Sequence, residues 1–242
     1  ADLSLYLEKK NYNLTVVGLP KTIDNDVHPI AQTMGAWTAA EQGAIFFENI
    51  VNENTTFERQ LIIHEIMGRH CGWLAAATAL EYRKRLKKIN FIPEIQILKK
   101  KWDVHSLLLP EENICIDEEC NRLNKVMDKY DCVNVFISEG AGMDKIIKEI
   151  KKSGESILQD AFGHVRLDEL NTGRWFANTL GKRLNAKKIL VQKSGYFSRS
   201  SKANKLDLQL IFEIADYAVK SAFEGNSGVV GWDQENSNKL SC

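Results

Sequence analysis

A single stretch near the start of the chain places a strand end, a turn and several charged side chains together: residues 16–26, Val16-Val17-Gly18-Leu19-Pro20-Lys21-Thr22-Ile23-Asp24-Asn25-Asp26. The β-branched residues that open the stretch are typical of a strand, and the proline indicates the turn that follows. In a parallel α/β sheet, ligands bind at the carboxyl ends of the strands. Asp24 and Asp26 project from this turn, so both can face a crevice.

The charged groups of the turn suit phosphoryl transfer. That reaction needs a base for the attacking hydroxyl, acidic groups for Mg²⁺ and a cation for the phosphate charge, and Asp24, Asp26 and Lys21 could fill these roles. The structural alternative is that Thr22, Asp24 or Asn25 merely caps a turn or a helix N-terminus. The stretch by itself leaves both interpretations open.

Composition limits the class of protein. A chain of 242 residues can bury a sizeable core as one large domain or two small ones, and its 44% apolar and 26% charged residues are ordinary for a soluble globular protein. Lys+Arg and Asp+Glu balance at 32 each, so no global field favours nucleic acid or an anionic membrane as partner. We find neither an apolar run long enough for a bilayer nor a signal peptide.

The five cysteines are odd in number and contain no C-x-x-C, which favours reduced thiols in a cytoplasmic protein. Cys115 and Cys120 could be grouped with His105 as a metal site. Their spacing matches no zinc pattern, so we expect no zinc there.

Helical and strand patterns alternate along the chain, which predicts an α/β fold with a mostly parallel sheet. Expected strands cover 14–17, 59–67, 89–97 (with Pro93 inside), 133–137 and 187–191. One expected helix ends near residue 12, and another ends near residue 152. The other expected helices cover 34–50, 73–83, 117–130 (Asp117 as N-cap), 167–184 (with a kink at Thr172-Gly173) and 207–223. We assign no element to 99–116 or 233–242, a linker to 153–156 and a polar loop to 195–204.

Three expected strand ends, at 18–26, 67–72 and 138–142, and the loop 195–204 carry carboxylates, arginines and glycines. We expect them on one side of one sheet, which is the layout that a phosphosugar pocket requires. Arg69 is either the side-chain partner of a phosphate or a solvated surface arginine. Neither a G-x-G-x-x-G nor a G-x-x-x-x-G-K-[ST] pattern is present, which argues against a dinucleotide-binding module.

The string PKTIDND at 20–26 resembles the active-site signature of the phosphofructokinases. Three further elements resemble that family: Met67-Gly68-Arg69, Ser138-Glu139-Gly140 and Tyr196-x-x-Arg199. The resemblance implies that Asp24 accepts the proton of the sugar 1-hydroxyl, that Thr22 and Ile23 contact donor phosphate or sugar, and that Asp26 lies near the metal. It further implies a substrate-binding role for six residues: Met67, Gly68, Arg69, Glu139, Tyr196 and Arg199.

Lys21 resembles the pyrophosphate-dependent branch of the family, as do residues 35–44 and 160–165. The resemblance therefore implies a three-layer α/β/α fold and a glycolytic reaction: phosphoryl transfer from pyrophosphate, or from ATP, to O1 of fructose 6-phosphate, with Mg²⁺. The competing hypothesis is a non-catalytic regulatory half of a duplicated phosphofructokinase. An intact TIDND argues against it, because an effector site has no use for a base.

The sequence also departs from the family pattern. Leu208 stands where many members have an arginine, and Gln60 stands where a neighbouring subunit often supplies one, with Arg59 one residue off. The glycine-rich donor segment G-G-D-[GD] that precedes TIDND in the family is not found. We therefore expect residues 1–242 to be the sugar-phosphate-binding part of a homo- or hetero-oligomeric enzyme, inactive alone, whose donor site an upstream segment or a second chain completes.

Overall fold

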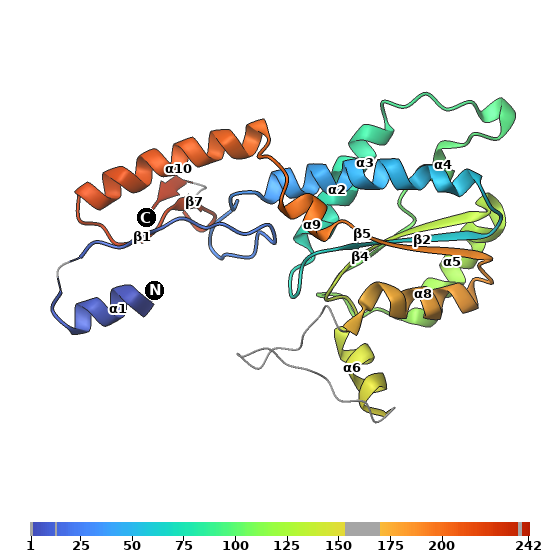
Figure 1. The fold of residues 1–242 in the computed structure, drawn as a ribbon, viewed down its shortest axis with the longest axis horizontal. Helices are drawn as coiled ribbons and strands as arrows, with labels where there is room; N and C mark the ends of the chain where they lie inside the picture. Colours follow the sequence, from blue (N-terminus) through green and yellow to red (C-terminus); the bar gives the residue numbers. More distant parts are fainter. Residues whose placement is uncertain (1, 13, 153–169, 237–238) are drawn as a thin grey trace. The chain divides into compact units, whose positions relative to one another are not determined.

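The computed structural model describes residues 2–12, 14–152, 170–236 and 239–242 (Figure 1). Its internal contacts divide the chain into two compact units: unit 1 comprises Ala1–Thr38 with Ser201–Cys242, and unit 2 comprises Ala39–Ser200. The first boundary falls inside helix α2 (Ala36–Ile50), and the second follows helix α9 (Gly195–Arg199). Within the described ranges, no helix is long and apolar enough to cross a membrane.

Unit 2 is built on a four-stranded sheet in the order β3-β4-β2-β5, and all of its pairings are parallel. The strands are β2 (Gln60–Ile66), β3 (Ser106–Leu108), β4 (Cys132–Ser138) and β5 (Lys188–Lys193). Leu61 of β2 lies opposite Val133 on one side and Ile189 on the other. Every residue of β2 and β4 is buried, as expected for central strands covered on both faces. The predicted parallel α/β fold is confirmed.

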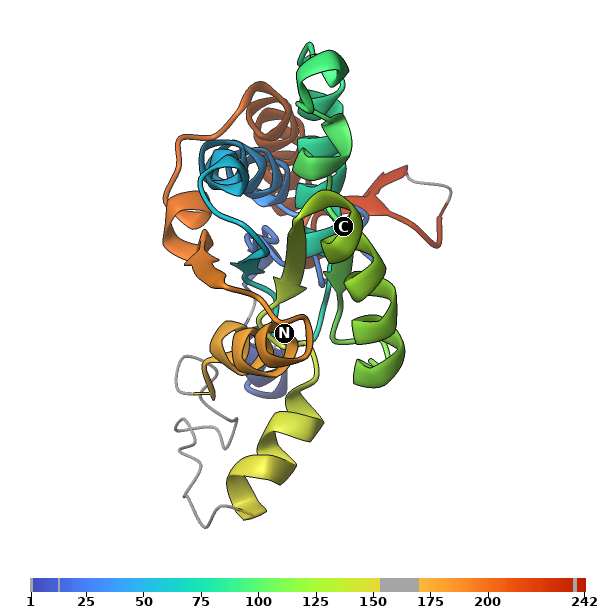
Figure 2. The same cartoon turned by 90° about the vertical axis from the view of Figure 1, so that its right-hand side faces the viewer.

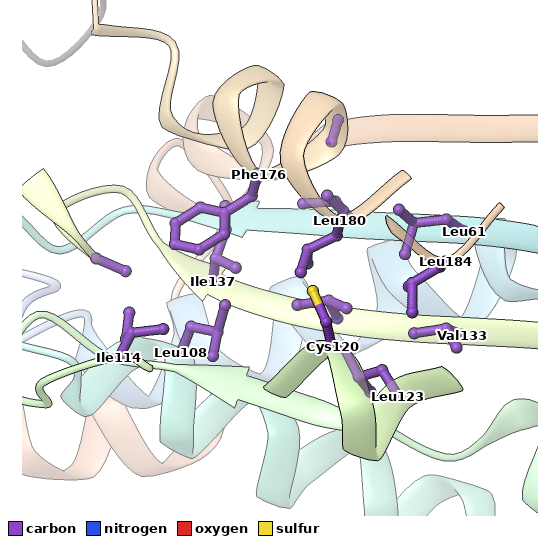
Figure 3. Close-up of a cluster of buried hydrophobic side chains, with 14 of the residues drawn as sticks. Leu61, Leu108, Ile114, Cys120, Leu123, Val133, Ile137, Phe176, Leu180 and Leu184 are labelled. Atoms are coloured by element: carbon purple, nitrogen blue, oxygen red, sulfur yellow. The ribbon is translucent and has the colours of Figure 1, made fainter. Parts of the chain in front are cut away.

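Helices cover both faces of this sheet (Figures 1 and 2). On one face lie α2 and α3 (Trp73–Leu86), where Phe47 and Tyr82 pack edge-on, with ring centroids 4.9 Å apart. On the other face, α5 (Ile116–Tyr130) and α8 (Thr172–Arg183) close over a cluster of buried apolar side chains, in which Phe176 and Leu180 contact the sheet (Figure 3). These layers form an α/β/α sandwich.

Smaller elements complete unit 2. They are η1 (Val51–Thr55), η2 (Pro93–Ile95), α4 (Lys99–Trp102) and α6 (Met143–Lys152). The helix α6 buries Ile146 against Leu170 and the partly buried Trp175 in a second, smaller cluster.

Unit 1 contains short strands and one long helix. Its elements are α1 (Asp2–Lys9), β1 (Val17–Gly18), α10 (Lys205–Phe223), β6 (Gly228–Val229), β7 (Gly231–Asp233) and β8 (Lys239–Ser241). The strands β1 and β6 pair in parallel, whereas β7 and β8 pair antiparallel. Leu210 and Ile214 of α10 pack on Val230, with Val17 and Trp232 around them.

The predicted strand at 89–97 is wrong. Pro93 begins a short 3₁₀ helix, and Ile92 and Ile97 form only an isolated bridge. Proline has no N–H for a strand ladder, and Ile92 and Ile95 are exposed rather than buried. The fourth strand of the sheet is instead β3, which lies inside the stretch 99–116 where no element was expected.

Several local predictions also need correction. Residues 195–199 form α9 rather than a loop, and the tail contains β8. Cys115 precedes α5 and Asp117 lies in its first turn, so Asp117 is not the N-cap. Asn171, at φ 49°, precedes α8, which begins at Thr172, and residues 167–169 of the longer helix expected there lie outside the described residues. The strand expected at 14–17 is reduced to β1. The expected linker 153–156 and the stretch 160–165 lie outside the described residues.

Candidate active site

The signature turn of unit 1 is held by hydrogen bonds from the segment that follows it. Asn25, at φ 55°, accepts hydrogen bonds from the N–H (2.7 Å) and the hydroxyl (3.0 Å) of Thr33 and donates one to the carbonyl of Ala31 (3.2 Å). The Thr33 hydroxyl also donates to the carbonyl of Thr22 (2.8 Å), and the Thr22 hydroxyl accepts the N–H of Asp24 (3.1 Å). Thr22 and Asn25 thus take part in the internal hydrogen bonding of the turn.

The charged side chains of the same turn are placed differently. Lys21 and Asp26 are exposed, and no described residue forms an ion pair with either of them. Asp24 is half-buried, and Ile23 is buried, so Ile23 anchors the turn in unit 1. The turn is therefore a fixed backbone that presents a cation and a carboxylate to solvent.

Asp207, which the sequence did not single out, fixes the segment behind this turn. Its buried carboxylate accepts hydrogen bonds from the N–H of Gly35 (2.9 Å) and from both the N–H (2.7 Å) and the hydroxyl (2.5 Å) of Thr38, at the start of α2. Asn204 caps α10 by accepting the N–H of Asp207 (3.0 Å). The start of α10 thereby holds the start of α2, which follows the signature turn.

In unit 2 the M-G-R and S-E-G elements lie side by side, because they follow the adjacent strands β2 and β4. The Gly140 N–H (3.2 Å) and the Ser138 hydroxyl (2.5 Å) both donate to the carbonyl of Gly68. In the other direction, the Gly68 N–H donates to the carboxylate of Glu139 (3.2 Å). The two predicted elements are therefore interlocked at the carboxyl edge of the sheet.

Two glycines are required for this close approach. Gly68 has φ +136°, a backbone angle that residues other than glycine rarely adopt. A Cβ on Gly140 would collide with the backbone carbonyl oxygen of Arg69. Arg69 and Glu139 themselves are half-buried at this edge, so their side chains remain accessible to a ligand.

A second buried carboxylate, that of Glu65, supports the same edge. It accepts the N–H of Gly173 at the start of α8 (2.8 Å) and forms an ion pair with Lys193 of β5 (2.9 Å). The Thr172 hydroxyl adds a hydrogen bond to the carbonyl of Glu139 (2.6 Å). The sequence signal for Glu65 was its place as a charged residue in a mostly apolar strand.

The short helix α9 carries Tyr196 and Arg199, both of which are exposed. It begins directly after β5 and lies on Met67: a Cβ on Gly195 would be 2.9 Å from the Met67 Cε atom. Met67 therefore packs under α9 and links the M-G-R element to the helix that presents Arg199.

The expectation that the three strand ends share one sheet is wrong for residues 18–26. They follow β1, which pairs with β6 in unit 1, whereas 67–72 and 138–142 follow strands of unit 2. Arg59 lies at the amino end of β2, away from the interlocked edge. Its guanidinium contacts Asp128 (2.8 Å) and the carbonyls of Leu184 (2.7 Å) and Asn185 (3.1 Å), which gives it a structural role within unit 2.

No group of three or more metal-ligating side chains occurs among the described residues. The ring of His105 is already engaged: Nε2 lies 2.7 Å from the carbonyl of Lys100, and Nδ1 accepts the N–H of Asn134 (2.9 Å). Burial raises the pKa of the Cys120 thiol and raises that of Cys132 to about 12, so both thiols stay protonated at neutral pH.

The burial of His64 in β2 predicts that the stability of the fold depends on pH. Its buried ring lies among Phe46, Phe47 and Phe136, and burial lowers its pKa to about 3. Below pH 6.5, His64 binds a proton in the unfolded chain but stays neutral in the folded chain. The free energy of unfolding should therefore fall as the pH falls from 6.5 toward 3. We expect a loss of about 2 kcal/mol from this group between pH 6.5 and pH 5.

The measurement is urea unfolding of the parent and of His64→Leu at pH 7 and pH 5. The variant should lack the part of the pH dependence that belongs to His64. Equal pH dependence in the two proteins would mean that His64 is protonated in the folded state.

The comparisons with known proteins identify the family of the chain. The family model described as phosphofructokinase matches residues 2–222. The pyrophosphate–fructose 6-phosphate 1-phosphotransferase of Methylomonas methanica is 52% identical over 240 residues, which are 99% of this chain and 59% of the relative. The protein of the same name from Propionibacterium freudenreichii subsp. shermanii is 52% identical over 241 residues, covering 100% of this chain and 60% of the relative.

The fold agrees as well. The structure of the pyrophosphate-dependent phosphofructokinase from Marinobacter aquaeolei matches with a TM-score of 0.67 at 22% identity, covering 99% of this chain and 53% of that one. The chain thus spans less than two thirds of the length of these proteins. Since the family model matches nearly the whole chain, from residue 2 to residue 222, the chain belongs to the phosphofructokinase family.

Proposed function

We propose that this chain forms the sugar-phosphate-binding part of a phosphofructokinase that transfers a phosphoryl group from pyrophosphate to O1 of fructose 6-phosphate, giving fructose 1,6-bisphosphate. The observation that carries the proposal is the interlocked edge of unit 2. There the buried backbones of Gly68 and Gly140 pack directly against each other, and the half-buried Arg69 and Glu139 lie beside them. A phosphorylated sugar needs this combination, since a carboxylate accepts its hydroxyls and a guanidinium binds its phosphate.

Unit 1 supplies the groups for the chemical step. Asp24 takes the proton of the 1-hydroxyl as that oxygen attacks the donor phosphorus. Thr22 and the backbone at Ile23 position donor or sugar, and Lys21 stabilises charge on the transferring group. The hydrogen bonds that Thr33 donates to Asn25 and to the carbonyl of Thr22 support these roles, because they fix the backbone of the turn. None of these bonds uses the carboxylate of Asp26.

Asp26 fits a role beside Mg²⁺. The ion typically binds one or two carboxylates together with substrate phosphates, and Asp26 is an exposed carboxylate that no described residue pairs with. When bound, Mg²⁺ neutralises part of the phosphate charge. The remaining residues hold the sugar phosphate: Met67 through its packing under α9, and Gly68, Arg69, Glu139, Tyr196 and Arg199 by contact with substrate.

Pyrophosphate is the proposed donor on two grounds. Lys21 is a cation beside the base, and both relatives at 52% identity bear the name of a pyrophosphate enzyme. Since the chain spans about 59% of such a relative, we further propose that a segment or chain beyond the one described completes the donor site within an oligomer.

The test is an assay of the full-length enzyme for fructose 1,6-bisphosphate formation with pyrophosphate and with ATP, alongside titration of this chain with fructose 6-phosphate. We expect turnover with pyrophosphate, and sugar-phosphate binding but no turnover by the 242-residue chain alone. Binding of fructose 6-phosphate by a full-length enzyme that turns over neither donor would instead identify a regulatory half.

We expect the substitution Arg199→Ala to change KM for fructose 6-phosphate. A charge-assisted contact to the 6-phosphate is made equally in the ground and transition states, so its loss should raise KM for fructose 6-phosphate and largely spare kcat. A contact worth roughly 1.5–3 kcal/mol corresponds to a rise of about 10- to 150-fold. Steady-state kinetics of the full-length enzyme measures both constants.

The matched control is Lys182→Ala, an exposed cation in the last turn of α8, which should leave KM unchanged. Fructose without the 6-phosphate should be insensitive to Arg199→Ala. If the variant affects both sugars equally, the arginine is structural.

A further inference from the structure

The buried carboxylate of Glu65 joins three elements of unit 2. It lies in β2, two residues before the M-G-R element, and it is 7% exposed. Its Oε2 atom accepts the N–H of Gly173 at the start of α8 (2.8 Å), and its Oε1 atom pairs with the ammonium group of Lys193 at the end of β5 (2.9 Å). A carboxylate is costly to bury unless it is both paired and hydrogen-bonded, so these two partners keep Glu65 ionised inside the fold.

The contact between Glu65 and α8 requires a glycine. A Cβ on Gly173 would lie 2.5 Å from the Glu65 Oε2 atom and 2.8 Å from a methyl group of Val191, and both distances are shorter than real Cβ contacts. The first turn of α8 can therefore sit directly on the carboxylate. The positive end of the helix dipole favours a negative charge in this place. The start of α8 is thus fixed relative to the end of β2.

Thr172, the first residue of α8, carries this fixed position to the interlocked edge. It is 2% exposed, and its hydroxyl donates to the carbonyl of Glu139 (2.6 Å). The N–H of Glu139 donates to the carbonyl of Ile66 (2.8 Å), and its carboxylate accepts the N–H of Gly68 (3.2 Å). Thr172 therefore holds Glu139 from α8, and the other two hydrogen bonds come from the end of β2.

The second partner of Glu65 connects it to α9. Lys193 is the last residue of β5, and α9 begins two residues later, at Gly195. The N–H of Ser194, between them, donates to the backbone carbonyl of Glu65 (3.2 Å). The side chain and the backbone of Glu65 therefore both hold the chain where it leaves the sheet. Because α9 carries Arg199, the position of that guanidinium depends on this contact.

We infer that Glu65, acting through Thr172 and Lys193, is a positioning residue that sets the spacing between Glu139 and Arg199. The inference rests on the proposed function, in which Glu139 accepts the hydroxyls and Arg199 binds the phosphate of one and the same ligand. A ligand held at both ends needs the two elements at a fixed spacing, and a misplacement of about 1 Å can cost about 100-fold. Both carboxylate oxygens of Glu65 are engaged within the protein, so it acts through its neighbours rather than on the ligand.

The first test compares side chains at residue 172 by steady-state kinetics of the full-length enzyme. Thr172→Val keeps the shape of the side chain but cannot donate to the carbonyl of Glu139. KM for fructose 6-phosphate should rise at least about tenfold, as for one lost hydrogen bond, with kcat nearly unchanged. Thr172→Ser keeps the hydroxyl and should have the parental KM. The matched control is Thr78→Val on α3, because the buried Thr78 hydroxyl has no hydrogen-bond partner among the described residues.

The second test removes the charge of residue 65. Glu65→Gln keeps an oxygen for the N–H of Gly173 but loses the ion pair with Lys193, so it loosens the start of α9 and leaves α8 in place. KM for fructose 6-phosphate should rise at least about threefold, as for a partly exposed ion pair, while KM for fructose, which lacks the phosphate, stays unchanged. Thr172→Val should instead raise KM for both sugars. The matched control is Glu119→Gln, which removes an ion pair with Arg122 on α5 (2.6 Å).

A measurement without ligand separates this inference from the proposed function. Since the N–H of Gly68 donates to the carboxylate of Glu139, its hydrogen exchange reports whether Glu139 is in place. Mass spectrometry of the peptide that contains Gly68, in the full-length enzyme, should show faster exchange in Thr172→Val and parental exchange in Thr172→Ser and Thr78→Val. Urea unfolding verifies that each variant is folded, and if one of Thr172→Val and Glu65→Gln does not fold, the other decides.

Parental KM values in Thr172→Val and Glu65→Gln, together with parental exchange at Gly68, would overturn the inference. So would a rise in KM that Thr172→Ser does not reverse, because the hydroxyl would then not be the group that holds Glu139. A parent enzyme that does not bind fructose 6-phosphate would refute the proposed function. Faster exchange at Gly68 in Thr172→Val would in that case still support the positioning of Glu139 by Thr172, and parental exchange would overturn it.

Discussion

Asp24→Ser in the full-length enzyme should lower kcat by about 10²- to 10⁴-fold while leaving KM for the sugar phosphate nearly unchanged. The reason is that a general base acts on the proton of the 1-hydroxyl only as the new bond to phosphorus forms. Serine cannot accept that proton at neutral pH. The backbone of the turn should persist, because the hydrogen bonds that Thr33 donates to Asn25 and to the carbonyl of Thr22 hold it.

The measurement is steady-state kinetics of phosphoryl transfer, together with titration of the variant with fructose 6-phosphate. Asp117→Ser is the matched control, since Asp117 is an exposed carboxylate in the first turn of α5, and it should retain parental kcat. A variant at Asp24 that keeps more than about a tenth of the parental kcat would remove this residue from the mechanism.

Gly140→Ala should disrupt the interlocked edge of unit 2. A Cβ at this position collides with the backbone carbonyl of Arg69, and backbone cannot move aside as the tip of a flexible side chain can. The two strand ends must separate, which breaks the hydrogen bond from the Gly140 N–H to the Gly68 carbonyl (3.2 Å). We expect a loss of stability of about 1–3 kcal/mol, as for overpacking elsewhere, and more than about tenfold weaker binding of fructose 6-phosphate.

Urea unfolding and calorimetric titration with fructose 6-phosphate measure the two effects. The matched control is Gly18→Ala, where the new Cβ would meet a Val229 methyl group at 3.4 Å, an ordinary contact. Unchanged binding in Gly140→Ala would show that the sugar phosphate does not use this edge, and the proposed function would lose its main support.

The sequence alone was informative wherever a pattern is local and repeated. The runs at 59–67 and 133–137 predicted β2 and β4, because strands buried on both faces are mostly apolar. The helical spacing of apolar residues predicted the helices α3, α5 and α10 to within a few residues. The string at 20–26 led to the family, which the match over residues 2–222 confirmed. The roles of Asp24, Lys21 and Arg199 stay predictions.

Elements whose pattern is short or interrupted were not predictable in the same way. The edge strand β3 has only three residues, too few for a periodicity, and its place in the sheet depends on β4 beside it. The apolar run at 89–97 is as rich in isoleucine as a strand, yet Pro93 removes the donor that pairing would need. Residues 195–199 looked polar enough for a loop, but Gly195 packs on Met67 and the segment closes into α9.

What the sequence by itself determined is the set of residue types and local elements: buried parallel strands, amphipathic helices and a turn rich in charge. Only the tertiary structure decided which distant groups meet. Asp207 holds the start of α2 from about 170 residues away, and Gly68 and Gly140 interlock across 72 residues. It also decided that residues 18–26 and the interlocked edge belong to different units. The physical reason is that a buried hydrogen-bonding group takes whichever partner the packed chain brings to it, and no local pattern records that partner.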